Sequence, residues 1–477
     1  MKVLFALIPE LILFIGAVIL FLTEPFTKKQ ERYFISSCSL LVVCFYILFA
    51  SYSMPENVYV VLSPFFIFSR LTQACKILLG IILGITLLLW TPENEEGFRF
   101  ELFPMILLSG MGLSLLMSSY HILMVIISLE LLSISLYILI AASMKPDKRS
   151  LESAIKYFVT GSVAAAFILM GAAVLYPFTG GWTDFGQMLD VKNLPALGLM
   201  GLALVISGFF FKISAAPFHF WTPDVYEGSP LPLVGYMATA VKLSGIVLLL
   251  QFLRTLKINI LVNIQNVVLM ISMLSLLIAN TLALFQKNIK RLLAYSSISH
   301  LGMILLGIYA IPAEKYFIPI NVLFYFVAYT FMTLGAFTFL IMTNSETIDD
   351  ISGMINRHPL LTGAMTLFMI SLTGLPPTIG FNAKLFIMMD LIHYRGLTAV
   401  PIALFAIFMS VISSFYYLGI VRAMFFDPLK SHDALRKPLD CCIGKRMILF
   451  ICFAGVIIFG CYPSPVLSVI QYLLQRI

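Results

Sequence analysis

The stretch PALGLMGLALVISGFFFKISAAP, residues 195–217, decides the fold class. It is an apolar run of the length that crosses a bilayer as a helix, about 17 to 25 residues, yet it contains the charged Lys212. A charged side chain at the bilayer centre costs about 2.5–3.5 kcal/mol, and Pro217 removes a backbone hydrogen bond close to it. The stretch therefore predicts a transmembrane helix that is interrupted beside a buried lysine.

The rest of the chain has the same character. Of its 477 residues, 60% are apolar and 11% are charged, against about 25% charged residues in an ordinary soluble domain. Apolar runs long enough to cross a bilayer predict about fourteen transmembrane helices, with no soluble domain between them. The predicted spans are 3–22, 34–53, 71–90, 102–118, 120–143, 153–176, 195–217, 230–252, 262–283, 290–310, 317–342, 360–388, 398–422 and 447–472. The expected fold class is an all-α polytopic membrane protein.

The basic residues predict the orientation of the chain. Loops on one side carry roughly seventeen Lys and Arg residues and those on the other roughly eight, and the richer side is usually cytoplasmic. The richer loops include Lys148, Arg149, Lys287, Lys290 and Arg291. We therefore expect both termini on the non-cytoplasmic side of the cell inner (plasma) membrane. We also expect the first span to be retained, since it lacks the basic region and cleavage site of a signal peptide.

Other motifs limit what the chain itself binds. The seven cysteines show no CxxC spacing and no Cys/His cluster that would hold zinc or an iron–sulfur cluster. Neither a dinucleotide-binding GxGxxG after a strand nor a phosphate-binding GxxxxGK[ST] is present. The net charge of +7 does not indicate a nucleic-acid partner, because several lysines lie inside apolar runs. We expect no cofactor, metal or nucleic acid on this chain.

Five charged residues lie deep inside predicted helices: Glu130, Lys156, Lys212, Lys242 and Lys384. Unpaired, they would together cost on the order of 10–15 kcal/mol, which is comparable to the stability of a whole domain. Burial disfavours the charged form of a lysine, and a nearby carboxylate restores it. A buried lysine beside a movable carboxylate can therefore take up and release a proton, which is the physical basis of a proton relay.

Other ionisable residues are open to two interpretations. Lys156 lies about one turn inside its helix, where both a functional role and snorkelling to the interface are consistent with the sequence. For Lys76 we expect snorkelling, and for Glu10 an interfacial or structural position. His219 and His300 can pass protons near neutral pH. Three serines near His300 have hydroxyls that could order water there: Ser296, Ser297 and Ser299.

A second interrupted helix suggests an internal repeat. Pro376-Pro377 precede Gly380 and Lys384, so this span also loses backbone hydrogen bonds at membrane depth, which is typical of discontinuous transporter helices. Spans 4–8 and 9–13 correspond weakly, although the order of lysine and proline is reversed between them. The expected organisation is 1–100 (N-terminal helices 1–3), 101–255 (first inverted repeat), 256–425 (second inverted repeat) and 426–477 (the end of a cytoplasmic loop and helix 14).

Several segments together carry a family resemblance. They are LELLSISLYIL (129–139), ESAIKYFVTGS (152–162), FKISAAPFHFWTPDVYEGSP (211–230), NIKRLLAYSSISHLGM (288–303) and LTGLPPTIGFNAKLF (372–386). They resemble the antiporter-like subunits of respiratory complex I, and most closely the subunit N family of bacterial NADH:quinone oxidoreductase. Lys384 favours subunits N and L over subunit M, which has glutamate there, and the chain length favours N over the longer L.

The resemblance implies a function and a set of roles. It implies fourteen transmembrane helices with two five-helix inverted repeats in which helices 7 and 12 are discontinuous. It implies that Glu130 pairs with Lys212, that Lys242 and His300 continue a central polar axis, and that Lys384 faces the exit side. The chain would translocate protons as a subunit of a translocase, beside antiporter-like neighbours in the membrane arm and the lipid bilayer. NADH, flavin, iron–sulfur clusters and quinone would be bound by partner subunits.

Two alternatives remain open on the sequence alone. A cation/proton antiporter subunit of the Mrp type would share the buried lysines. A scaffold subunit of the membrane arm would use the charges only to dock its neighbours.

Overall fold

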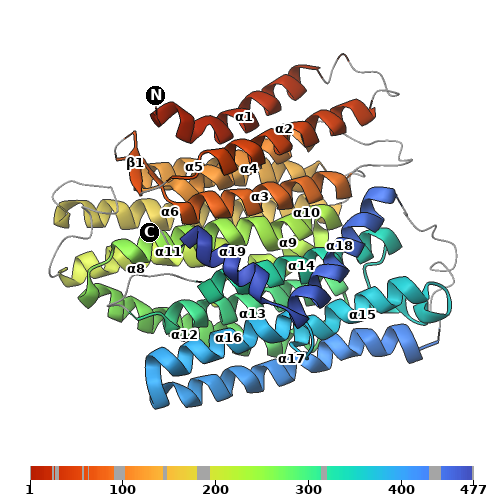
Figure 1. Ribbon diagram of the computed structural model, residues 1–477. Helices are drawn as coiled ribbons and strands as arrows, with labels where there is room; N and C mark the ends of the chain where they lie inside the picture. The colour runs from red at the N-terminus through yellow and green to blue at the C-terminus, as the bar shows by residue number, and fades with distance from the viewer. Residues whose placement is uncertain are drawn as a thin grey trace. The chain divides into compact units, whose positions relative to one another are not determined.

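The computed structural model describes most of the chain. The described residues are 2–23, 26, 32–55, 58–62, 64–90, 102–142, 148–179, 194–312, 320–428 and 442–474. They are almost entirely helical (Figure 1). They form two compact units, one of Met1–Ile213, Gly228–Leu261 and Leu473–Ile477, the other of Ser214–Glu227 and Val262–Tyr472. These units are defined by packing, and the repeat boundaries predicted above remain a prediction.

The described elements between residues 2 and 255 are helices and two short strands. They are α1 (Lys2–Thr23), α2 (Arg32–Tyr52), β1 (Tyr59–Val61), β2 (Phe66–Phe68), α3 (Arg70–Leu89), α4 (Leu102–Ser118), α5 (Ile122–Ala141), α6 (Lys148–Leu175), η3 (Tyr176–Phe178), α8 (Ala196–Ile213), α9 (Trp221–Gly228), α10 (Leu231–Tyr236), η4 (Met237–Val241) and α11 (Lys242–Thr255). The strands β1 and β2 form a short antiparallel hairpin that the sequence analysis did not predict.

The remaining elements are also helices. They are α12 (Ile258–Ala283), α13 (Ile289–Ala310), α14 (Ile320–Thr343), η5 (Asp349–Ile351), η6 (Met354–Asn356), α15 (Pro359–Thr373), α16 (Ile379–Arg395), η7 (Gly396–Ala399), α17 (Val400–Phe426), α18 (Ile443–Cys461) and α19 (Ser464–Leu474). The predicted last span, 447–472, is thus two helices that separate at Tyr462 and Pro463.

Both predicted interruptions are present. The helix α8 ends at Ile213, directly after Lys212, and Ser214 has a positive φ of 64°. The predicted span 195–217 therefore stops four residues before its predicted end at Pro217, and the short α9 follows. The helix α15 ends at Thr373, and Gly374 has a φ of 85°, in the left-handed region where a side chain is strained.

A third irregularity precedes Lys242 and was not predicted. Residues Met237–Val241 form a π-helix between α10 and α11, with all five residues buried. A π-helical turn inserted in a helix is rare and often marks a functional position. The sequence gives no signal for it, because MATAV has no proline or glycine.

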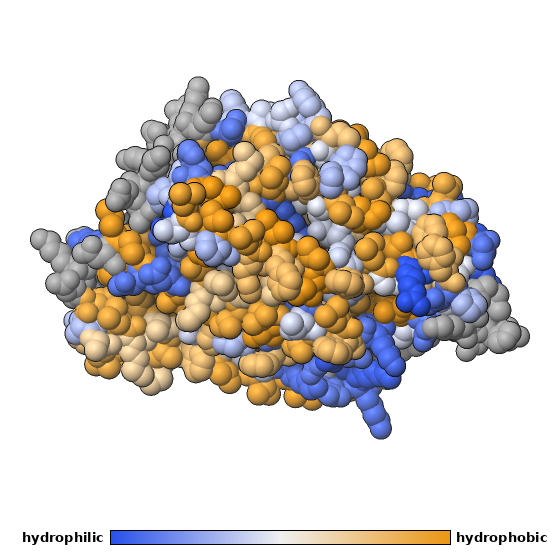
Figure 2. All heavy atoms as spheres, turned by 90° about the horizontal axis from the view of Figure 1, so that it is seen from below, coloured by the Kyte–Doolittle hydropathy of each residue, from blue (hydrophilic) through white to orange (hydrophobic). Residues whose placement is uncertain are grey.

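The fold class of a multi-span membrane protein is confirmed. Among the described residues, twelve helical stretches are long and apolar enough to cross a membrane. Large apolar side chains are exposed along them, such as Ile155 on α6 (62%) and Phe415 on α17 (69%). Figure 2 shows that apolar side chains cover much of the visible face. A soluble monomer rarely exposes so large an apolar surface, so we place this surface against lipid.

Candidate functional site

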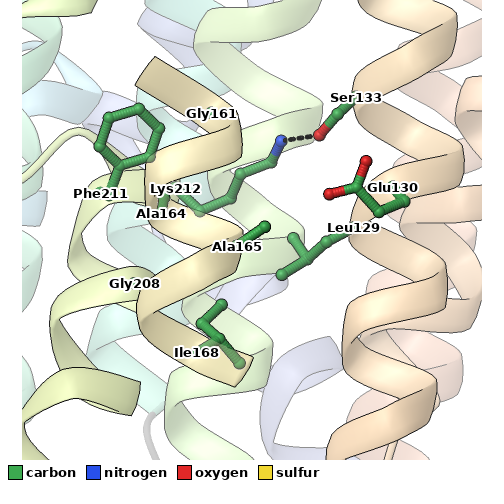
Figure 3. A pocket seen from close by; sticks show the side chains of 10 residues that line it. All are labelled: Leu129, Glu130, Ser133, Gly161, Ala164, Ala165, Ile168, Gly208, Phe211 and Lys212. Atoms are coloured by element: carbon green, nitrogen blue, oxygen red, sulfur yellow. Dashed lines mark hydrogen bonds between the residues drawn. The ribbon is translucent and has the colours of Figure 1, made fainter. Parts of the chain in front are cut away.

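The helices α5, α6 and α8 enclose a small cavity that contains both Lys212 and Glu130 (Figure 3). Lys212 is in the last turn of α8, Glu130 lies in the middle of α5, and small residues of α6 line the space between them. The cavity has a volume of about 20 Å³, enough for a water molecule, which needs about 10–15 Å³. The structure thus brings two of the predicted residues to one place.

The Lys212 ammonium is held by neutral hydroxyls. Its Nζ donates hydrogen bonds to Ser133 Oγ at 3.0 Å and to Tyr157 OH at 3.2 Å, and the side chain is 7% exposed. Within the described part of the chain, no carboxylate oxygen lies within 4.0 Å of this Nζ. The half-buried Glu130 is near enough to act on Lys212 electrostatically, and its carboxylate points into the same space (Figure 3). Lys212 and Glu130, which were predicted to pair, therefore do not form a direct ion pair in this conformation.

Close packing of α6 on α8 fixes the two walls of the cavity. A Cβ added at Gly171 would lie 2.6 Å from the carbonyl oxygen of Gly201, and one added at Gly201 would lie 3.0 Å from that of Gly171. Two backbones approach this closely in membranes where small residues line the contact. Tyr157, on the same face of α6 as Gly171, is 1% exposed and packs edge-on against Tyr137 at 5.1 Å.

Sequence reasoning missed the neutral partners of Lys212. Ser133 lies three residues after Glu130, so both share one face of α5, and Tyr157 follows the charged Lys156 directly. Hydroxyls are frequent in membrane helices, so their types alone gave no signal. The helical spacing from Glu130 was the available clue for Ser133.

Lys242 belongs to the same compact unit as Lys212 and is 2% exposed. It is the first residue of α11, immediately after the π-helix Met237–Val241. The extra residue of a π-helical turn changes the direction in which the following side chains point. The irregular backbone therefore sets the direction of the Lys242 side chain.

His300 lies in a cluster of hydroxyls within the other unit. Its Nδ1 contacts Tyr325 OH at 2.8 Å and its Nε2 contacts Tyr417 OH at 3.2 Å. Tyr417 OH also shares a hydrogen bond with Ser296 Oγ, which places one predicted serine in the network through a tyrosine. The tyrosines come from α14 and α17 and were not predicted. Each hydroxyl can both accept and donate a hydrogen bond, so the cluster is chemically suited to pass a proton.

Lys384 covers the end of the second interrupted helix. Its Nζ donates hydrogen bonds to the carbonyl oxygens of Leu372, at 3.2 Å, and Thr373, at 2.7 Å. These are among the last carbonyls of α15, which lack partners within the helix and carry its negative dipole end. A Cβ added at Gly374 would lie 2.8 Å from Cδ of Lys384. The left-handed glycine thus gives both the turn and the space for the lysine.

The two remaining candidates lie outside these clusters. Lys156 pairs with Glu152 at 2.8 Å on the surface of α6, with exposed fractions of 44% and 64%. His219, between α8 and α9, is 4% exposed and stacks on Phe220 at 5.0 Å. Among the described residues, its Nδ1 is buried without a hydrogen-bond partner. The structure brings neither residue to the cavity of Lys212.

The expectation for Lys76 was wrong, and that for Glu10 is narrowed. Lys76 does not snorkel, because it is 0% exposed and its Nζ lies 2.5 Å from Oε1 of Glu10. Glu10 takes the structural of its two expected positions, 2% exposed between α1, α3 and α4. The sequence places these residues 66 positions apart, so nothing local revealed that each supplies the other's counter-charge.

An ion-pair cluster explains two of the sequence motifs. Arg291, at the start of α13, donates hydrogen bonds to Asp224 at 2.7 Å and Glu227 at 2.8 Å, both on α9. Lys290 pairs with Glu346 at 2.7 Å and donates to the carbonyl oxygen of Glu227 at 3.2 Å. The acidic residues of WTPDVYEG therefore attach α9, the short helix after the first interruption, to the start of α13.

Metal-binding side chains are dispersed in the described part of the chain. Within the residues that the structure describes, no three His, Cys, Asp or Glu side chains lie together as a metal site would require. Lys212 and His300 contact hydroxyls, and Lys384 contacts backbone carbonyls.

Comparison with known proteins identifies the relatives of this chain. The sequence profile of the family described as NADH:quinone oxidoreductase/Mrp antiporter, TM, matches residues 119–410. The NADH-quinone oxidoreductase subunit N of Thioalkalivibrio sulfidiphilus is 32% identical, over 97% of this chain and 96% of its own. A chain of respiratory complex I from Thermus thermophilus, solved with bound aureothin, has 30% identity and a TM-score of 0.81, covering 96% of this chain and 98% of that one.

A more distant relative shares the fold. A chain of the Mrp complex from a Dietzia species has 16% identity and a TM-score of 0.84, covering 100% of this chain and 96% of that one. At this identity the similarity concerns the fold. The sequence relatives over nearly the full length decide the narrower assignment, and this chain belongs to the family of NADH-quinone oxidoreductase subunit N.

Proposed function

We propose that this chain is an antiporter-like subunit of the membrane arm of a respiratory NADH:quinone oxidoreductase and that it moves protons across the membrane. The observation that carries the proposal is the cavity at the end of α8, where Lys212 and Glu130 share a buried space between three helices. An ionisable residue inside a membrane domain is costly and usually functional. A lysine and a carboxylate in one cavity beside a helix break form a site for reversible proton binding.

The contacts of Lys212 suggest how one step works. With its ammonium bound by the neutral Ser133 and Tyr157, the lysine lacks a direct counter-charge, and burial then favours release of its proton. Movement of Glu130 toward Lys212 would stabilise the ammonium by a Coulomb energy that is large in a low-dielectric site. Closing and opening this pair would therefore bind a proton and then release it.

Further groups would continue the path. By family resemblance, the order is Lys212, Lys242, His300 and Lys384, with Lys384 toward the exit, while Lys156 and His219 would have auxiliary roles. Lys212 and Lys242 lie in one compact unit, and His300 and Lys384 lie in the other. Each unit thus has its own lysine at a helix break, buried for Lys212 and half-buried for Lys384, together with hydroxyls or carbonyls that bind protonated groups.

The parent complex would supply the driving force. In this proposal, NADH, flavin, iron–sulfur clusters and quinone react on partner subunits, and this chain has no redox site of its own. Conformational or electrostatic changes in those subunits would open and close the pair of Glu130 and Lys212. The complex would lie in the cell inner (plasma) membrane, with both termini of this chain on the non-cytoplasmic side, as the positive-inside rule predicts.

Replacement of Glu130 tests the proposal. In vesicles containing the complete complex, Glu130→Ala should lower NADH-driven proton uptake while the complex still assembles, because Lys212 loses its movable counter-charge. Glu152→Gln is the matched control, since Glu152 is an exposed acid on the neighbouring helix α6. Full proton uptake in Glu130→Ala would contradict the proposal.

A cation/proton antiporter of the Mrp type is the alternative, because the matching family profile includes both groups. The two functions predict different consequences of deleting the chain. Loss of NADH oxidation coupled to proton uptake supports the complex I subunit. Sensitivity of growth to sodium at alkaline pH, with normal NADH oxidation, would support the antiporter.

A further inference from the structure

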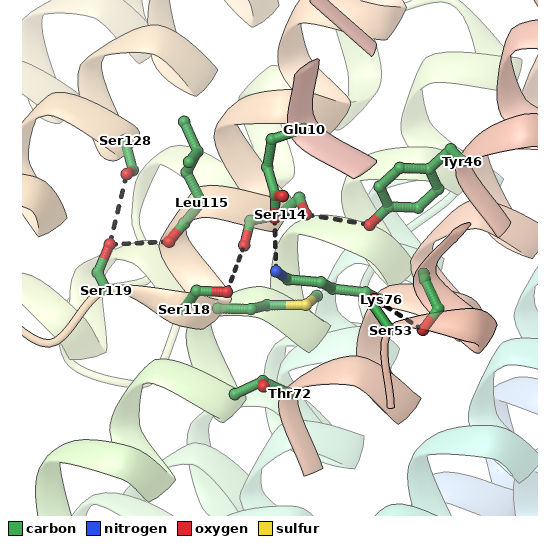
Figure 4. Close-up of polar contacts among 12 residues, drawn as sticks. Glu10, Tyr46, Ser53, Thr72, Lys76, Ser114, Leu115, Ser118, Ser119 and Ser128 are labelled. Atoms are coloured by element: carbon green, nitrogen blue, oxygen red, sulfur yellow. Dashed lines mark hydrogen bonds and ion pairs between the residues drawn. The ribbon is translucent and has the colours of Figure 1, made fainter. Parts of the chain in front are cut away.

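Glu10 and Lys76 form a buried ion pair outside the predicted path (Figure 4). Both side chains are at most 2% exposed. They lie between α1, α3 and α4, within the unit that also contains Lys212. From the helix rise of about 1.5 Å per residue, each lies about 9 to 12 Å from the first residue of its helix, which is inside the apolar region of a membrane.

The pair is surrounded by groups that can exchange hydrogen bonds. Oε1 of Glu10 accepts a hydrogen bond from Ser114 Oγ at 2.7 Å, and Ser114 Oγ accepts one from Tyr46 OH at 3.1 Å. The ring of Phe68 lies 4.5 Å from Nζ of Lys76 and shields one side of the ammonium. Tyr46 lies close enough to Glu10, Cys75 and Tyr236 to interact with them electrostatically. Tyr46, Cys75 and Tyr236 are neutral near pH 7 in their ordinary state, so these neighbours bring hydroxyls and a thiol to the pair but no further charge.

Some polar atoms near the pair have no hydrogen-bond partner among the described protein groups. Within the described residues, Oε2 of Glu10 and both polar atoms of the Gln73 side chain are buried without a hydrogen-bond partner. Gln73 lies three residues before Lys76, so both share one face of α3. Buried polar groups normally have a partner, and leaving one without costs free energy. A pair that served only to hold helices together would not need this extra acceptor and amide.

A row of buried serines extends from the pair along α4. Ser118 Oγ donates to the carbonyl oxygen of Ser114 at 3.4 Å, and Ser119 Oγ lies 3.4 Å from Ser128 Oγ on α5. All of these hydroxyls are buried, and Figure 4 shows two groups of contacts, one of Glu10, Ser114 and Ser118 and one of Ser119 and Ser128. Buried serine hydroxyls thus lie between the N-terminal helices and the helix that contains Glu130.

We propose that Glu10 and Lys76 form a second proton-exchanging site of this subunit, with buried serine hydroxyls between it and α5. A proton moves from Nζ of Lys76 to Oε1 of Glu10, so that an N–H bond breaks, an O–H bond forms and the pair becomes neutral. Glu10 then releases a proton to water, while Lys76 binds another proton from water. One proton enters and one leaves, and no oxidant or reductant is needed.

The energetics favour a functional pair over a structural one. A buried ion pair is seldom more stabilising than apolar residues of similar size, whereas removing one partner is strongly destabilising. Glu10→Gln and Lys76→Met should therefore each lower the amount of assembled complex. The double variant E10Q/K76M has no buried charge and should assemble again.

The double variant tests this inference, which rests on the proposed function, in vesicles containing the complete complex. We expect E10Q/K76M to restore assembly and lower coupled proton uptake about tenfold, since a positioned acid–base group commonly speeds proton transfer about a hundredfold or more. Infrared difference spectra should also lose a carboxylic acid band on Glu10→Gln. Thr86→Val is the matched control, because Thr86 is buried on α3 and its hydroxyl bonds only to the carbonyl of Ile82 in its own helix.

The outcomes separate this inference from the proposed function. Lys212→Ala, measured in parallel, reports on the proposed function alone. If Lys212→Ala loses proton uptake while E10Q/K76M keeps the wild-type rate, the second site is wrong and the proposed function stands. If the double variant does not assemble, Ser114→Ala decides, because it removes the hydrogen bond that Oε1 of Glu10 accepts without changing charge, and a wild-type rate there overturns the inference.

Discussion

At the scale of single residues, the neutral hydrogen-bond partners of Lys212 are the most informative finding. Ser133 and Tyr157 accept its hydrogen bonds in place of a carboxylate. A hydrogen bond to a neutral hydroxyl satisfies the ammonium without cancelling its charge. A buried lysine in this state gives up its proton more readily than one paired with a carboxylate.

Tyr157→Phe should slow proton release. The substitution keeps the ring and removes the acceptor at 3.2 Å from Nζ of Lys212, which favours the closed pair with Glu130. A hydrogen bond from a charged donor is worth about 1.5–3 kcal/mol, so coupled proton uptake should fall about tenfold to a hundredfold. Proton uptake in vesicles measures the effect, and a rate equal to or above that of the wild type would contradict this role of Tyr157.

Gly374→Ala should destabilise the second helix break. The left-handed conformation costs an L residue about 1–2 kcal/mol, and the new Cβ would lie 2.8 Å from the side chain of Lys384. The thermal unfolding midpoint of the purified complex should therefore fall. In Gly363→Ala, the control on the same helix, a new Cβ meets nothing within 4 Å, so that variant should be neutral or slightly stabilising. Equal midpoints for the two variants would refute the role of Gly374.

At this scale the sequence identifies the charged residues inside apolar runs, but not their partners. Glu130 and Lys212 stand out because a charge in an apolar run is costly wherever its partner lies. The ion pair of Lys76 with Glu10 could not be predicted, because it depends on which helices pack together. A lysine near the start of a helix has the same local sequence whether it snorkels or is buried.

At the scale of helices, the attachment of α9 shows how a broken helix is held in place. Its eight residues are too few to form a stable helix alone. Arg291 binds both of its acidic residues, Asp224 and Glu227. The ion pairs thus hold the segment after the break against the start of α13.

Arg291→Ala should loosen α9. The charged groups are 29–35% exposed, so each pair contributes no more than about 1 kcal/mol after screening by solvent. Loss of both should speed amide hydrogen exchange in residues 221–228 about tenfold. Glu152→Gln, which breaks an exposed pair on α6, should leave exchange in that helix nearly unchanged. Unchanged exchange in 221–228 on Arg291→Ala would show that α9 is held by other contacts.

Helix interruptions were predictable where proline or glycine marks them. Pro217 and Pro376-Pro377 gave the two breaks, although α8 ends four residues before Pro217. Proline disfavours the helical conformation of the residue before it. A helix therefore ends before the proline, and the proline lies outside the helix. The π-helix before Lys242 has no such residue, and packing of side chains determines it.

At the scale of the whole molecule, the two units have corresponding parts. Each contains a helix that ends beside a glycine or serine with positive φ and a lysine at that break, Lys212 in one and Lys384 in the other. The sequence showed this correspondence weakly, because the order of lysine and proline is reversed. The backbone adds that the chain turns at a residue with positive φ at each break, Ser214 and Gly374.

Variants in both units should reveal whether the lysines act in series. If one proton path uses both, Lys212→Ala and Lys384→Ala should each lower coupled proton uptake, and the double variant should be no slower than the slower single variant. Two independent paths predict instead that the singles are partly active and that their losses add. Coupled proton uptake by the three variants, at equal amounts of assembled complex, distinguishes the two arrangements.

The most direct test of proton translocation is NADH-driven proton uptake in inverted membrane vesicles with Lys212→Ala. NADH oxidation by an artificial electron acceptor is measured on the same vesicles. We predict loss of proton uptake and of quinone reduction with unchanged artificial-acceptor activity, which means an assembled complex whose membrane step needs Lys212. Unchanged proton uptake would contradict the account, because it would remove the residue on which the cavity of α5, α6 and α8 is centred.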